Sequence, residues 1–588
     1  MKHASAISLP VALILTITAI STGAIISTYT QLSHTWDEGT HVVAGLEWLQ
    51  DGRYTIQTEN PPLSRIPLAI IPYLRGAHLP PPERRLGGQT FIVDTVFFRS
   101  PDYIRNVTEA RVVTLVFFWA CIAFTWLLAG GRSDRWTALL AAASVATLPP
   151  IVGHSGLATT DVAFVASFLL VLLALRRLLT NPSPGAAVIA GASLGFAVAT
   201  KFSTLVLLPP VVAAVLFTHY LSDRTALTTM RRLSWSCIVV IPVVAAIVIW
   251  AAYRFQVGRL ADLPTAFGPF GTLAASALPA FVLGWRIPAH EFVHGLLYLK
   301  AHTVAGHSAT LWDVFSSRGF LLYYPVVLAT KTPIPFIVIA LAGLAGMARL
   351  TRVKPWPWHA GLALGALGVL AVSMTSPINL GVRHVMVIYP LVAIPAAFGL
   401  VRLAESATHR QAVLATTAAA LISQIVMLIA SVPNQLTYFN ALAGPEPAYV
   451  SSDSDFDWGQ DALYLERYFA RHPVPELYVL LHGTTKVCSL NIPPVRSLPN
   501  HPVSGWIAVS ERAFRVNQGV IRENPCELPG DPGRTFTAPH GWLDWLKQYR
   551  PVDQIGKTIR LYHITDVQKR SSRHDGQMGT GAISAGRN

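Results

Sequence analysis

Eleven long apolar runs constrain the fold of this chain more than any other feature. A bilayer is crossed by roughly 20 apolar residues in a helix, and each run approaches or exceeds that length. They begin near Ile7, Val112, Trp136, Val162, Ala186, Phe202, Trp235, Leu321, Trp358, Val385 and Ala412. Only 13% of the 588 residues are charged, whereas a soluble domain carries about 25%. The sequence therefore predicts a polytopic α-helical membrane protein with about eleven transmembrane helices.

Basic residues set the predicted orientation, because short cytoplasmic connections are enriched in Lys and Arg. They gather in alternate connections, at Arg132, Arg135, Arg176, Arg177, Arg224, Arg231, Arg232, Arg349, Arg352, Lys354, Arg402 and Arg410. The first run has no clear cleavage site before Asp37, so we expect an uncleaved anchor with a cytoplasmic N-terminus. We expect a multi-pass protein of the plasma (inner) membrane, with the active site and C-terminal domain extracytoplasmic. The net charge of +14 lies in these clusters and predicts no nucleic-acid partner.

Three regions follow from this pattern. Residues 1–433 form the predicted transmembrane domain, with a first long loop at 32–106 and a second at 253–320. An apolar stretch at 263–285, broken by prolines and glycines, is expected to be re-entrant or interfacial.

Residues 434–566 are predicted to be a small α/β extracytoplasmic domain, and residues 567–588 a disordered tail. Strands are expected at 476–482, 505–510 and 558–564, and helices at 461–471 and 542–549. Cys488 and Cys526 lie in this region. They form one disulfide if the region is extracytoplasmic, and two free thiols are the alternative.

Two adjacent carboxylates, Asp37 and Glu38, directly follow the first apolar run, and His41 comes shortly after. Low-dielectric surroundings raise a carboxyl pKa toward neutral pH, which suits a general base. The alternative is an interfacial charge pair that only ends the helix. Further along the first long loop, Asn60 begins Asn60-Pro61-Pro62-Leu63. The amphipathic run that follows, to Tyr73, is expected to lie along the membrane interface.

Three isolated cations stand at outer span edges: Lys201, Lys331 and Arg383. Charge at membrane depth is costly and marks function by default, so these residues indicate an anionic partner such as a lipid phosphate. Snorkelling of the side chains to lipid headgroups is the alternative. Asp161 starts the fourth run on the same side, and it either holds a cation or metal or caps a helix.

A zinc-protease pattern competes with this interpretation: His290, Glu291 and His294 place two histidines one helical turn apart with a glutamate between. A catalytic zinc needs a third ligand, for which His302 and His307 are the nearby candidates. The extended pattern is absent, since Leu297 stands where its glycine belongs.

An acidic segment at 453–461, containing Asp457 and Gln460, is similar to a calcium loop. Its glycine comes one place late and Tyr464 stands at the closing glutamate position, so we predict no EF-hand. A sugar, a metal or neighbouring backbone are its candidate partners, and a capped helix start is the alternative.

Taken in order, these segments resemble the membrane glycosyltransferases of the GT-C class. The specific likeness is to bacterial relatives of the dolichyl-phosphate-mannose protein mannosyltransferases and of the lipid A aminoarabinose transferases. The motifs that carry it are Trp36-Asp37-Glu38, Asn60-Pro61-Pro62-Leu63, Thr160-Asp161, residues 195–201, 323–333 and 379–384, and the stretch from Tyr438-Phe439-Asn440 through Asp457-Trp458-Gly459-Gln460-Asp461.

The resemblance implies an inverting transfer of a sugar from a polyprenyl-phosphate donor, of dolichyl or undecaprenyl type, to an acceptor on the outer membrane face. Asp37 matches the catalytic acidic residue, with Glu38 beside it, and Lys201, Lys331 and Arg383 occupy places suited to the donor phosphate. No MIR repeats follow, so the acceptor is left open among protein, lipid and glycan. The sugar is left open too, and so is the cofactor, with a divalent metal cation as one option.

Two rival functions stay open at this point. One is the zinc metalloprotease that uses Glu291, and the other is a non-enzymatic lipid or sugar transporter in which the same charges line a pathway. Transporters often carry internal hydropathy repeats, and none is visible in the sequence.

Overall fold

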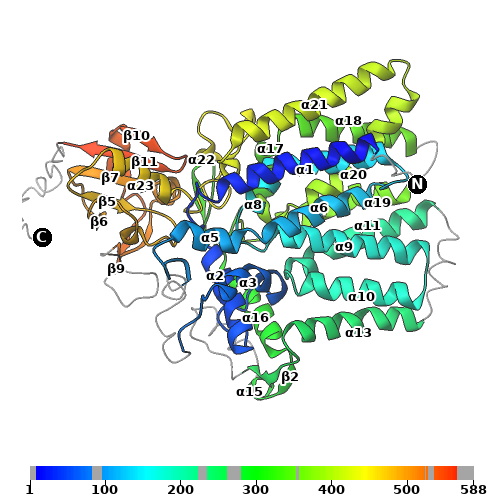
Figure 1. The fold of residues 1–588 in the computed structure, drawn as a ribbon, viewed down its shortest axis with the longest axis horizontal. Coiled ribbons are helices and arrows are strands. Elements are labelled where there is room, and N and C mark those ends of the chain that lie inside the picture. The colour runs from blue at the N-terminus through cyan, green and yellow to red at the C-terminus, as the bar shows by residue number, and fades with distance from the viewer. Residues whose placement is uncertain are drawn as a thin grey trace, which may run out of the picture.

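The computed structural model describes residues 8–81, 96–222, 235–260, 280–351, 356–522, 525–526 and 535–565. Within these ranges, long helices lie side by side in a bundle, and a mixed α/β portion stands at one end of it (Figure 1). Both long loops lie at that same end. The bundle helices are α1 (Leu9–Thr28), α6 (Thr114–Leu128), α7 (Arg135–Ala146), α8 (Pro149–Ser155), α9 (Asp161–Thr180), α10 (Pro184–Val198), α11 (Ser203–Ser222), α13 (Trp235–Ala252), α17 (Tyr323–Lys331), α18 (Ile334–Thr351), α19 (Pro357–Met374), α20 (Ile388–Ser406) and α21 (Arg410–Ser431).

Each of the eleven apolar runs coincides with a bundle helix or with a bent pair of helices. In the described residues, 7 helices are long and apolar enough to cross a membrane, or up to 9 if each bent pair counts as one span. The helices α10 and α13 are apolar but shorter. A multi-pass membrane protein is therefore confirmed, while the count of eleven stays a prediction.

Prolines explain the two bent pairs. The axes of α7 and α8 differ by 63°, and α8 begins with Pro149 and Pro150. Between α17 and α18 the bend is 109°, at Thr332, which is extended and precedes Pro333. A residue before proline is disfavoured in the helical region, so each helix stops there and restarts in a new direction.

Small residues let α13 approach α10 closely. A side chain at Gly191 would collide with the carbonyl of Ile241, and one at Gly195 with the carbonyl of Ala245. Glycine at such contacts is common where membrane helices pack, because dispersion contacts drive their association. This packing fixes the end of α10 at Val198, three residues before Lys201.

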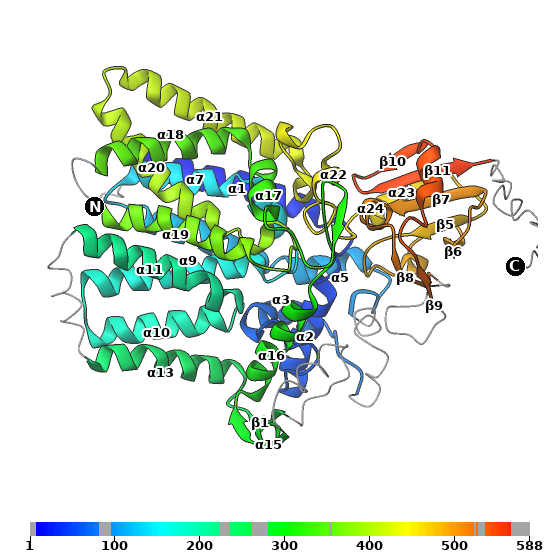
Figure 2. The same ribbon diagram turned by 180° about the vertical axis from the view of Figure 1, so that it is seen from behind.

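The first long loop folds into helices beneath the α/β portion (Figure 2). They are α2 (Glu38–Asp51), η1 (Pro62–Ser64), α3 (Arg65–Leu74) and α5 (Tyr103–Arg111). The predicted amphipathic run corresponds to η1 and α3. Gly45 of α2 lies against the Arg65 carbonyl and Ala69 of α3, so the two helices pack at close range.

The second long loop is described on both sides of a gap, residues 261–279. It contains β1 (Val257–Arg259), α15 (Ala280–Leu283), β2 (Arg286–Pro288), α16 (His290–Ala305), β3 (Ala309–Leu311) and β4 (Val314–Ser316). Most of the segment predicted to be re-entrant, residues 263–285, lies outside the described residues. The same holds for Arg224, Arg231, Arg232, Arg352, Lys354 and the tail at 567–588.

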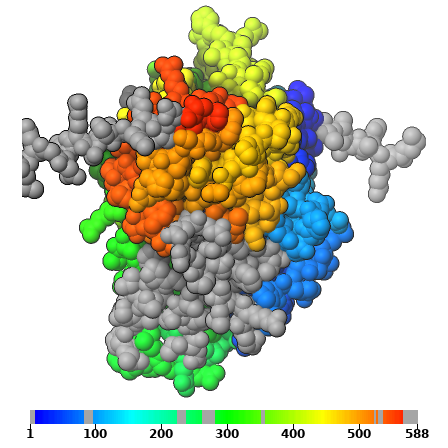
Figure 3. Space-filling view, turned by 90° about the vertical axis from the view of Figure 1, so that its left-hand side faces the viewer, coloured from blue at the N-terminus to red at the C-terminus, as the bar shows by residue number. Residues whose placement is uncertain are grey.

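The C-terminal portion, residues 434–565, is built on a five-stranded sheet of order β10-β11-β7-β5-β6. Strand β5 is parallel to β6 and β7, whereas β11 is antiparallel to β7 and β10. Its elements are η5 (Gln435–Thr437), η6 (Ala441–Ala443), α22 (Pro447–Val450), α23 (Ala462–Arg471), β5 (Leu477–Leu480), η7 (Val487–Ser489), β6 (Val495–Ser497), β7 (Gly505–Ser510), α24 (Glu511–Val516), β8 (Gly519–Arg522), β9 (Thr535–Ala538), η8 (Asp544–Gln548), β10 (Asp553–Ile555) and β11 (Ile559–Ile564). Figure 3 looks onto this end, where the yellow to red residues of this portion lie beside the blue first long loop.

Three predicted strands and one predicted helix coincide with β5, β7, β11 and α23, while residues 542–549 form a 3-10 helix instead of an α-helix. The structure joins Cys488 and Cys526 in a disulfide, the first of the two alternatives. Leu465 and Phe469 of α23 pack on one face of the sheet, which shows why its apolar residues recur at helical spacing. The assignment of this portion as a separate extracytoplasmic domain stays a prediction.

Candidate active site

An ion pair between two distant loops stands at the centre of the site. Arg383, in η4 (Val382–His384), donates from Nη1 to Oδ2 of Asp37 at 2.8 Å. Asp37 immediately precedes α2 at its N-cap position, and its side chain makes no capping hydrogen bond to that helix. The Asp37 side chain is 26% exposed, whereas that of Arg383 is 8% exposed. Asp37 is thus held by a buried cation while its carboxylate still reaches open space.

A second ion pair extends the first. Nζ of Lys201 lies 2.5 Å from Oδ1 of Asp161, and Nη1 of Arg383 lies 3.9 Å from Oδ2 of Asp161. Alternating charges therefore run from Asp37 through Arg383 and Asp161 to Lys201, which we call the charge chain. The sequence predicted all four residues as site candidates, and the structure brings all four together.

The charge chain borders a cavity of about 400 Å³, here called the first cavity. Its volume lies within the range of small-molecule sites. Among its lining residues are Trp36, Asp37, His41, Gln57, Glu59, Asn60, Thr160, Lys201, Tyr298, His302, His307, Arg383, His384, Asp453, Trp458, His482 and Arg512. The predicted candidates His41 and Asn60 thus share one cavity with Asp37, Lys201 and Arg383.

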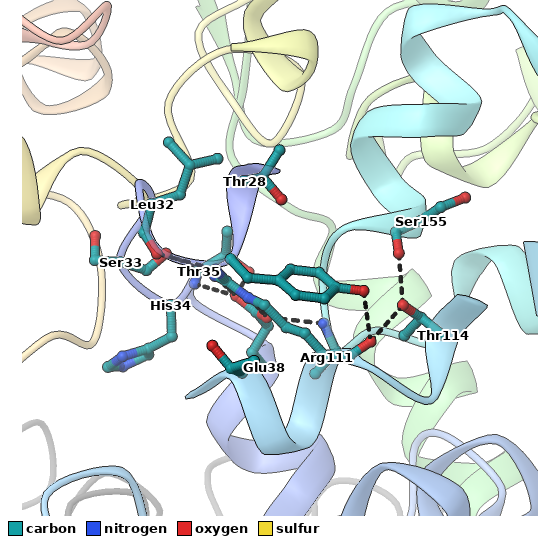
Figure 4. Close-up of polar contacts among 12 residues, drawn as sticks. Thr28, Leu32, Ser33, His34, Thr35, Glu38, Arg111, Thr114 and Ser155 are labelled. Atoms are coloured by element: carbon teal, nitrogen blue, oxygen red, sulfur yellow. Dashed lines mark hydrogen bonds and ion pairs between the residues drawn. The ribbon is translucent and has the colours of Figure 1, made fainter. Parts of the chain in front are cut away.

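Glu38 has a different environment from its neighbour Asp37 (Figure 4). Its carboxylate is fully buried, accepts two hydrogen bonds from Arg111 at 2.8 Å, and accepts two more from the backbone N–H groups of Thr35 and Ala158. Burial by itself raises a carboxyl pKa, but the Arg111 guanidinium outweighs it and holds the pKa of Glu38 below its usual range. Glu38 is not among the described residues that line the first cavity. Its contacts fix the turn that carries Asp37.

Arg65 is a buried arginine that the sequence did not indicate. It holds several residues of the first-cavity wall in place. Arg65 donates from Nε to Nδ1 of His41 at 3.0 Å, and from Nη1 to the carbonyl of Gln57 at 2.6 Å and of Asn60 at 3.3 Å. Burial, together with the Arg65 charge, holds the pKa of His41 well below its usual value, so the imidazole is neutral. Arg65 is a charged residue inside the apolar run at 62–73, and this exception to the pattern could have identified it.

Glu59 is a further cavity residue that the sequence did not single out. It lies in the first cavity with Asp37 and Asn60. Burial raises the pKa of Glu59 to about 7, against the opposing charge of Arg65, and the negative charge of Asp37 adds to the rise. Besides Asp453, which pairs with Arg512, the first cavity therefore holds one carboxyl group that pairs with Arg383 and one whose pKa is raised to about 7.

Lys331 is separated from the other two predicted phosphate ligands. Its Nζ donates to the carbonyls of Leu436 at 2.6 Å and Asp455 at 2.7 Å, and it lies 4.5 Å from the centre of the Phe439 ring. It is not among the described residues that line the first cavity. In this structure Lys331 holds the chain that leads from the bundle into the acidic segment.

The acidic segment at 453–461 packs against the η4 segment that carries Arg383. Asp455 accepts from the backbone N–H of Val382 at 2.8 Å, and Gly381 has a φ of 86° in close contact with the Asp455 carboxylate. A side chain at position 381 would be strained at this positive φ and would collide with the Asp455 carboxylate. The Trp458 ring lies 4.2 Å from the Arg383 guanidinium, a cation–π contact. The segment thus positions Arg383.

Asp457 and Gln460, the predicted candidates of this segment, bind protein backbone. Asp457 accepts from the N–H of Arg512 at 2.8 Å, and burial raises the pKa of Asp457 to about 7. Gln460 accepts from the N–H of Trp458 at 2.9 Å and donates to the carbonyl of Phe456 at 2.8 Å. Of the partners that the sequence left open, neighbouring backbone is the one observed.

The zinc-like histidines of α16 point to separate partners. Nδ1 of His290 lies 3.0 Å from Glu291, whereas Nδ1 of His294 lies 2.8 Å from the hydroxyl of Thr58. Nε2 of His302 is 3.2 Å from Nδ1 of His307. The described part of the chain contains no group of three or more His, Cys, Asp or Glu that converges as metal ligands do.

Comparison with known proteins places part of the chain in a family context. The family model described as dolichyl-phosphate-mannose-protein mannosyltransferase matches residues 104–250, which include Asp161 and Lys201. The resemblance predicted from the sequence is confirmed over this segment. No curated protein matches the chain.

Several solved structures are similar in overall arrangement. ArnT from Cupriavidus metallidurans bound to undecaprenyl phosphate is 14% identical, with a TM-score of 0.47 over 90% of this chain and 98% of that chain. The archaeal oligosaccharyltransferase AglB from Archaeoglobus fulgidus, in complex with an inhibitory peptide and a dolichol-phosphate, is 13% identical, with a TM-score of 0.42 over 90% of this chain and 74% of that chain. The arabinosyltransferase EmbB from Mycobacterium smegmatis is 10% identical, with a TM-score of 0.37 over 73% of this chain and 38% of that chain.

The fold and the site together define a multi-pass membrane protein with a charged cavity at the loop-bearing end of its helix bundle. Over residues 104–250 this protein is similar to the dolichyl-phosphate-mannose-protein mannosyltransferases.

Proposed function

We propose that this chain is a glycosyltransferase of the GT-C class. It transfers a sugar from a polyprenyl-phosphate donor to an acceptor hydroxyl on the outer face of the plasma (inner) membrane, with inversion at the anomeric carbon. The observation that carries the proposal is the charge chain, in which one partly exposed carboxylate and two buried cations border a single cavity. The family match over residues 104–250 supports the same class of reaction.

Lys201 and Arg383 bind the donor phosphate in this proposal. Arg383 uses Nε and Nη1 for contacts with Leu380 and Asp37 within the described part of the chain. Its Nη2 carries two more N–H donors, and a planar guanidinium suits the paired oxygens of a phosphate. Negative charge grows on the phosphate as the glycosidic bond breaks, so fixed cations stabilise the transition state more than the ground state.

Asp37 acts as the general base. It accepts the proton of the acceptor hydroxyl while that oxygen attacks the anomeric carbon from the face opposite the phosphate. The bond from the anomeric carbon to the phosphate oxygen breaks, and its electron pair leaves with the phosphate, which needs no proton. Glu38 takes no part in the proton transfer, because its carboxylate is committed to Arg111 and two backbone N–H groups.

The residues around Asp161 do not fit a divalent cation. Lys201 contacts one oxygen of its carboxylate, and Arg383 lies near the other. A metal bound there would meet two positive charges at close range. No step of the proposed reaction therefore runs through a metal.

Lipid analysis tests the proposed function. In cells that lack this chain, mass spectrometry of lipid extracts should show accumulation of one polyprenyl-phosphate sugar and loss of one glycoconjugate. Expression of the wild-type chain should restore both levels. Unchanged lipid-linked sugars and unchanged glycoconjugates would contradict the proposal.

A further inference from the structure

A second cavity, of about 500 Å³, lies in the C-terminal portion at the carboxyl ends of β5 and β7. The residues of its wall that carry the argument are Trp36, His482, Thr484, Ser510, Arg512 and Trp542. Nothing in the reaction described above uses this cavity. Its volume is larger than that of the first cavity, so it can hold a ligand of several rings or residues.

The topology of the sheet favours a ligand at this place. The chain runs from β5 to β6 on one side of the sheet and then crosses back to β7 on the other side of β5. These three strands are parallel. Because β6 lies on one side of β5 and β7 on the other, the strand order reverses between β5 and β7. In open α/β sheets, ligands bind outside the carboxyl ends of the strands at such a switch point. The second cavity lies there, bounded by residues 481–484 after β5 and by Arg512 and Ala513 after β7.

The two cavities adjoin each other. Trp36, His482 and Arg512 line both of them. The ring of Trp36 stacks on that of His482, with centres 4.9 Å apart and an interplanar angle of 12°, and Trp36 is still 39% exposed. Asp37 follows Trp36 directly in the chain. A ligand held in the second cavity can therefore extend past Trp36 to the carboxylate of Asp37.

A close contact between two glycines keeps this junction compact. Gly459 has a φ of 90° and Gly483 a φ of 137°, and a side chain at Gly459 would meet the Cα atom of Gly483. Only glycine tolerates both conditions at once. The acidic segment is thus brought against the end of β5, where the two cavities meet.

The wall chemistry favours a neutral polyhydroxyl ligand over an anionic one. Arg512 forms an ion pair with Asp453, so its charge is balanced inside the protein. Lys486 is the other described cation of the wall, and the acidic residues Asp457 and Asp461 also line this cavity. No excess of positive charge is left for a phosphate group.

The same wall offers what a sugar ring needs. The indole rings of Trp36 and Trp542 provide apolar faces. The hydroxyls of Thr484 and Thr485 donate to the carbonyls of Trp36 and His34, so their oxygens can still accept hydrogen bonds from a sugar. An extended peptide is usually bound along an unpaired strand edge. Strands β5 and β7 are interior strands and offer no such edge, but β8 and β9 form a two-stranded sheet and also contribute residues to the wall, so a peptide is the alternative that the binding test includes.

We propose that the second cavity binds a neutral saccharide acceptor, whose reacting hydroxyl reaches Asp37 past Trp36. This inference rests on the proposed glycosyl transfer and adds to it the class and the path of the acceptor. The donor phosphate occupies the Lys201 and Arg383 side of the first cavity, and the acceptor enters from the C-terminal portion.

Binding of defined saccharides to the purified full-length protein in detergent tests this inference. The probes are hexasaccharides of mannose, glucose and galactose, together with a short Ser/Thr-rich peptide, measured by saturation-transfer NMR and titration. The test variant is Ala513→Trp, which fills the second cavity from α24. The matched control is Ala470→Trp, at an exposed position of α23 that is not among the described lining residues.

We expect at least one hexasaccharide to bind the wild type and the Ala470→Trp variant equally, and Ala513→Trp to weaken that binding at least about tenfold. Val516→Trp, from the same wall, replaces Ala513→Trp if that variant unfolds at a lower temperature than the wild type. Binding of the peptide alone, binding of no hexasaccharide, or binding that both filling variants leave unchanged would overturn the inference. Because binding is measured without turnover, failure of the proposed transfer reaction would not alter this result.

Discussion

The guanidinium of Arg383 and the carboxylate of Asp37 are 2.8 Å apart, although 346 positions separate the two residues in the chain. Arg383 also lies 3.9 Å from Asp161, so one cation connects two carboxylates that come from different segments of the chain. In the proposed reaction this arginine has two tasks. It orients the base, and it receives the phosphate that departs.

Removal of the Arg383 guanidinium tests both of these roles. Arg383→Gln should lower kcat by about 10²–10³, the range found when one donor to a developing negative charge is lost. Arg402→Gln is the matched control, because Arg402 also pairs with carboxylates, Asp134 and Glu405, but does so away from the first cavity. Equal activity in the two variants would remove Arg383 from the transition state.

Glu38 should matter for folding, since its carboxylate is fully buried against Arg111. Breaking one partner of such a pair typically costs about 3–5 kcal/mol, because the other charge is left uncompensated. Glu38→Gln should therefore lower the unfolding temperature in detergent, while Glu405→Gln, at a half-exposed ion pair, should change it little. A Glu38→Gln variant that unfolds like the wild type but transfers no sugar would instead make Glu38 a catalytic residue.

The two buried lysines should behave differently from each other. Lys201 lines the first cavity, whereas Lys331 donates to two backbone carbonyls away from it. We expect Lys201→Met to raise the KM for the lipid donor by about tenfold or more, and Lys331→Met to lower the unfolding temperature with little change in that KM. An equal rise in KM for both variants would restore the phosphate-binding role that the sequence predicted for Lys331.

Donor binding should weaken as the pH rises through neutrality. The pKa of Glu59 is raised to about 7, so this cavity carboxyl is mostly neutral at lower pH and gains its negative charge above that value. A negative charge beside the phosphate site repels the donor, so the KM should rise from pH of about 6 to pH of about 8. Glu59→Gln stays neutral and should flatten this dependence. A KM that rises equally in wild type and variant would assign the titration to another group.

The same shift has a consequence for stability. An unfolded glutamate has its ordinary lower pKa, so between that value and about 7 the folded protein binds more protons than the unfolded chain. Stability attributable to Glu59 is therefore present at low pH and is lost as the pH rises through its folded pKa. Unfolding temperatures of wild type and Glu59→Gln should converge toward acid pH and differ most above neutral pH, with the wild type the less stable.

The sequence was sufficient to predict the membrane class and the four residues of the charge chain. Apolar runs of helical length leave few other folds, and Asp37, Asp161, Lys201 and Arg383 are visible because charges are rare in such surroundings. The strands β5, β7 and β11 follow from short β-branched and aromatic runs bounded by turn residues.

What the sequence did not predict depends on contacts between distant segments. Nothing local distinguishes Glu38 from Asp37, since the Arg111 that claims Glu38 lies 73 positions further along the chain. Lys331 resembles Lys201 in its sequence surroundings, yet its partners are carbonyls from residues more than a hundred positions away. Arg512 was missed because an arginine in a polar stretch of sequence carries no signal until the fold brings it to the cavity.

The proposed reaction requires Asp37 to act as the base at a lipid-phosphate site. Sugar transfer by membranes that contain an Asp37 variant tests this role. Membranes that contain wild type, Asp37→Asn or Asp553→Asn are supplied with a polyprenyl-phosphate sugar, and transfer and free polyprenyl phosphate are measured. Asp553 is exposed on β10 and serves as the matched control. We expect Asp37→Asn to lower transfer by about a hundredfold or more at equal expression, with the control unchanged. Full transfer by Asp37→Asn would exclude Asp37 as the base.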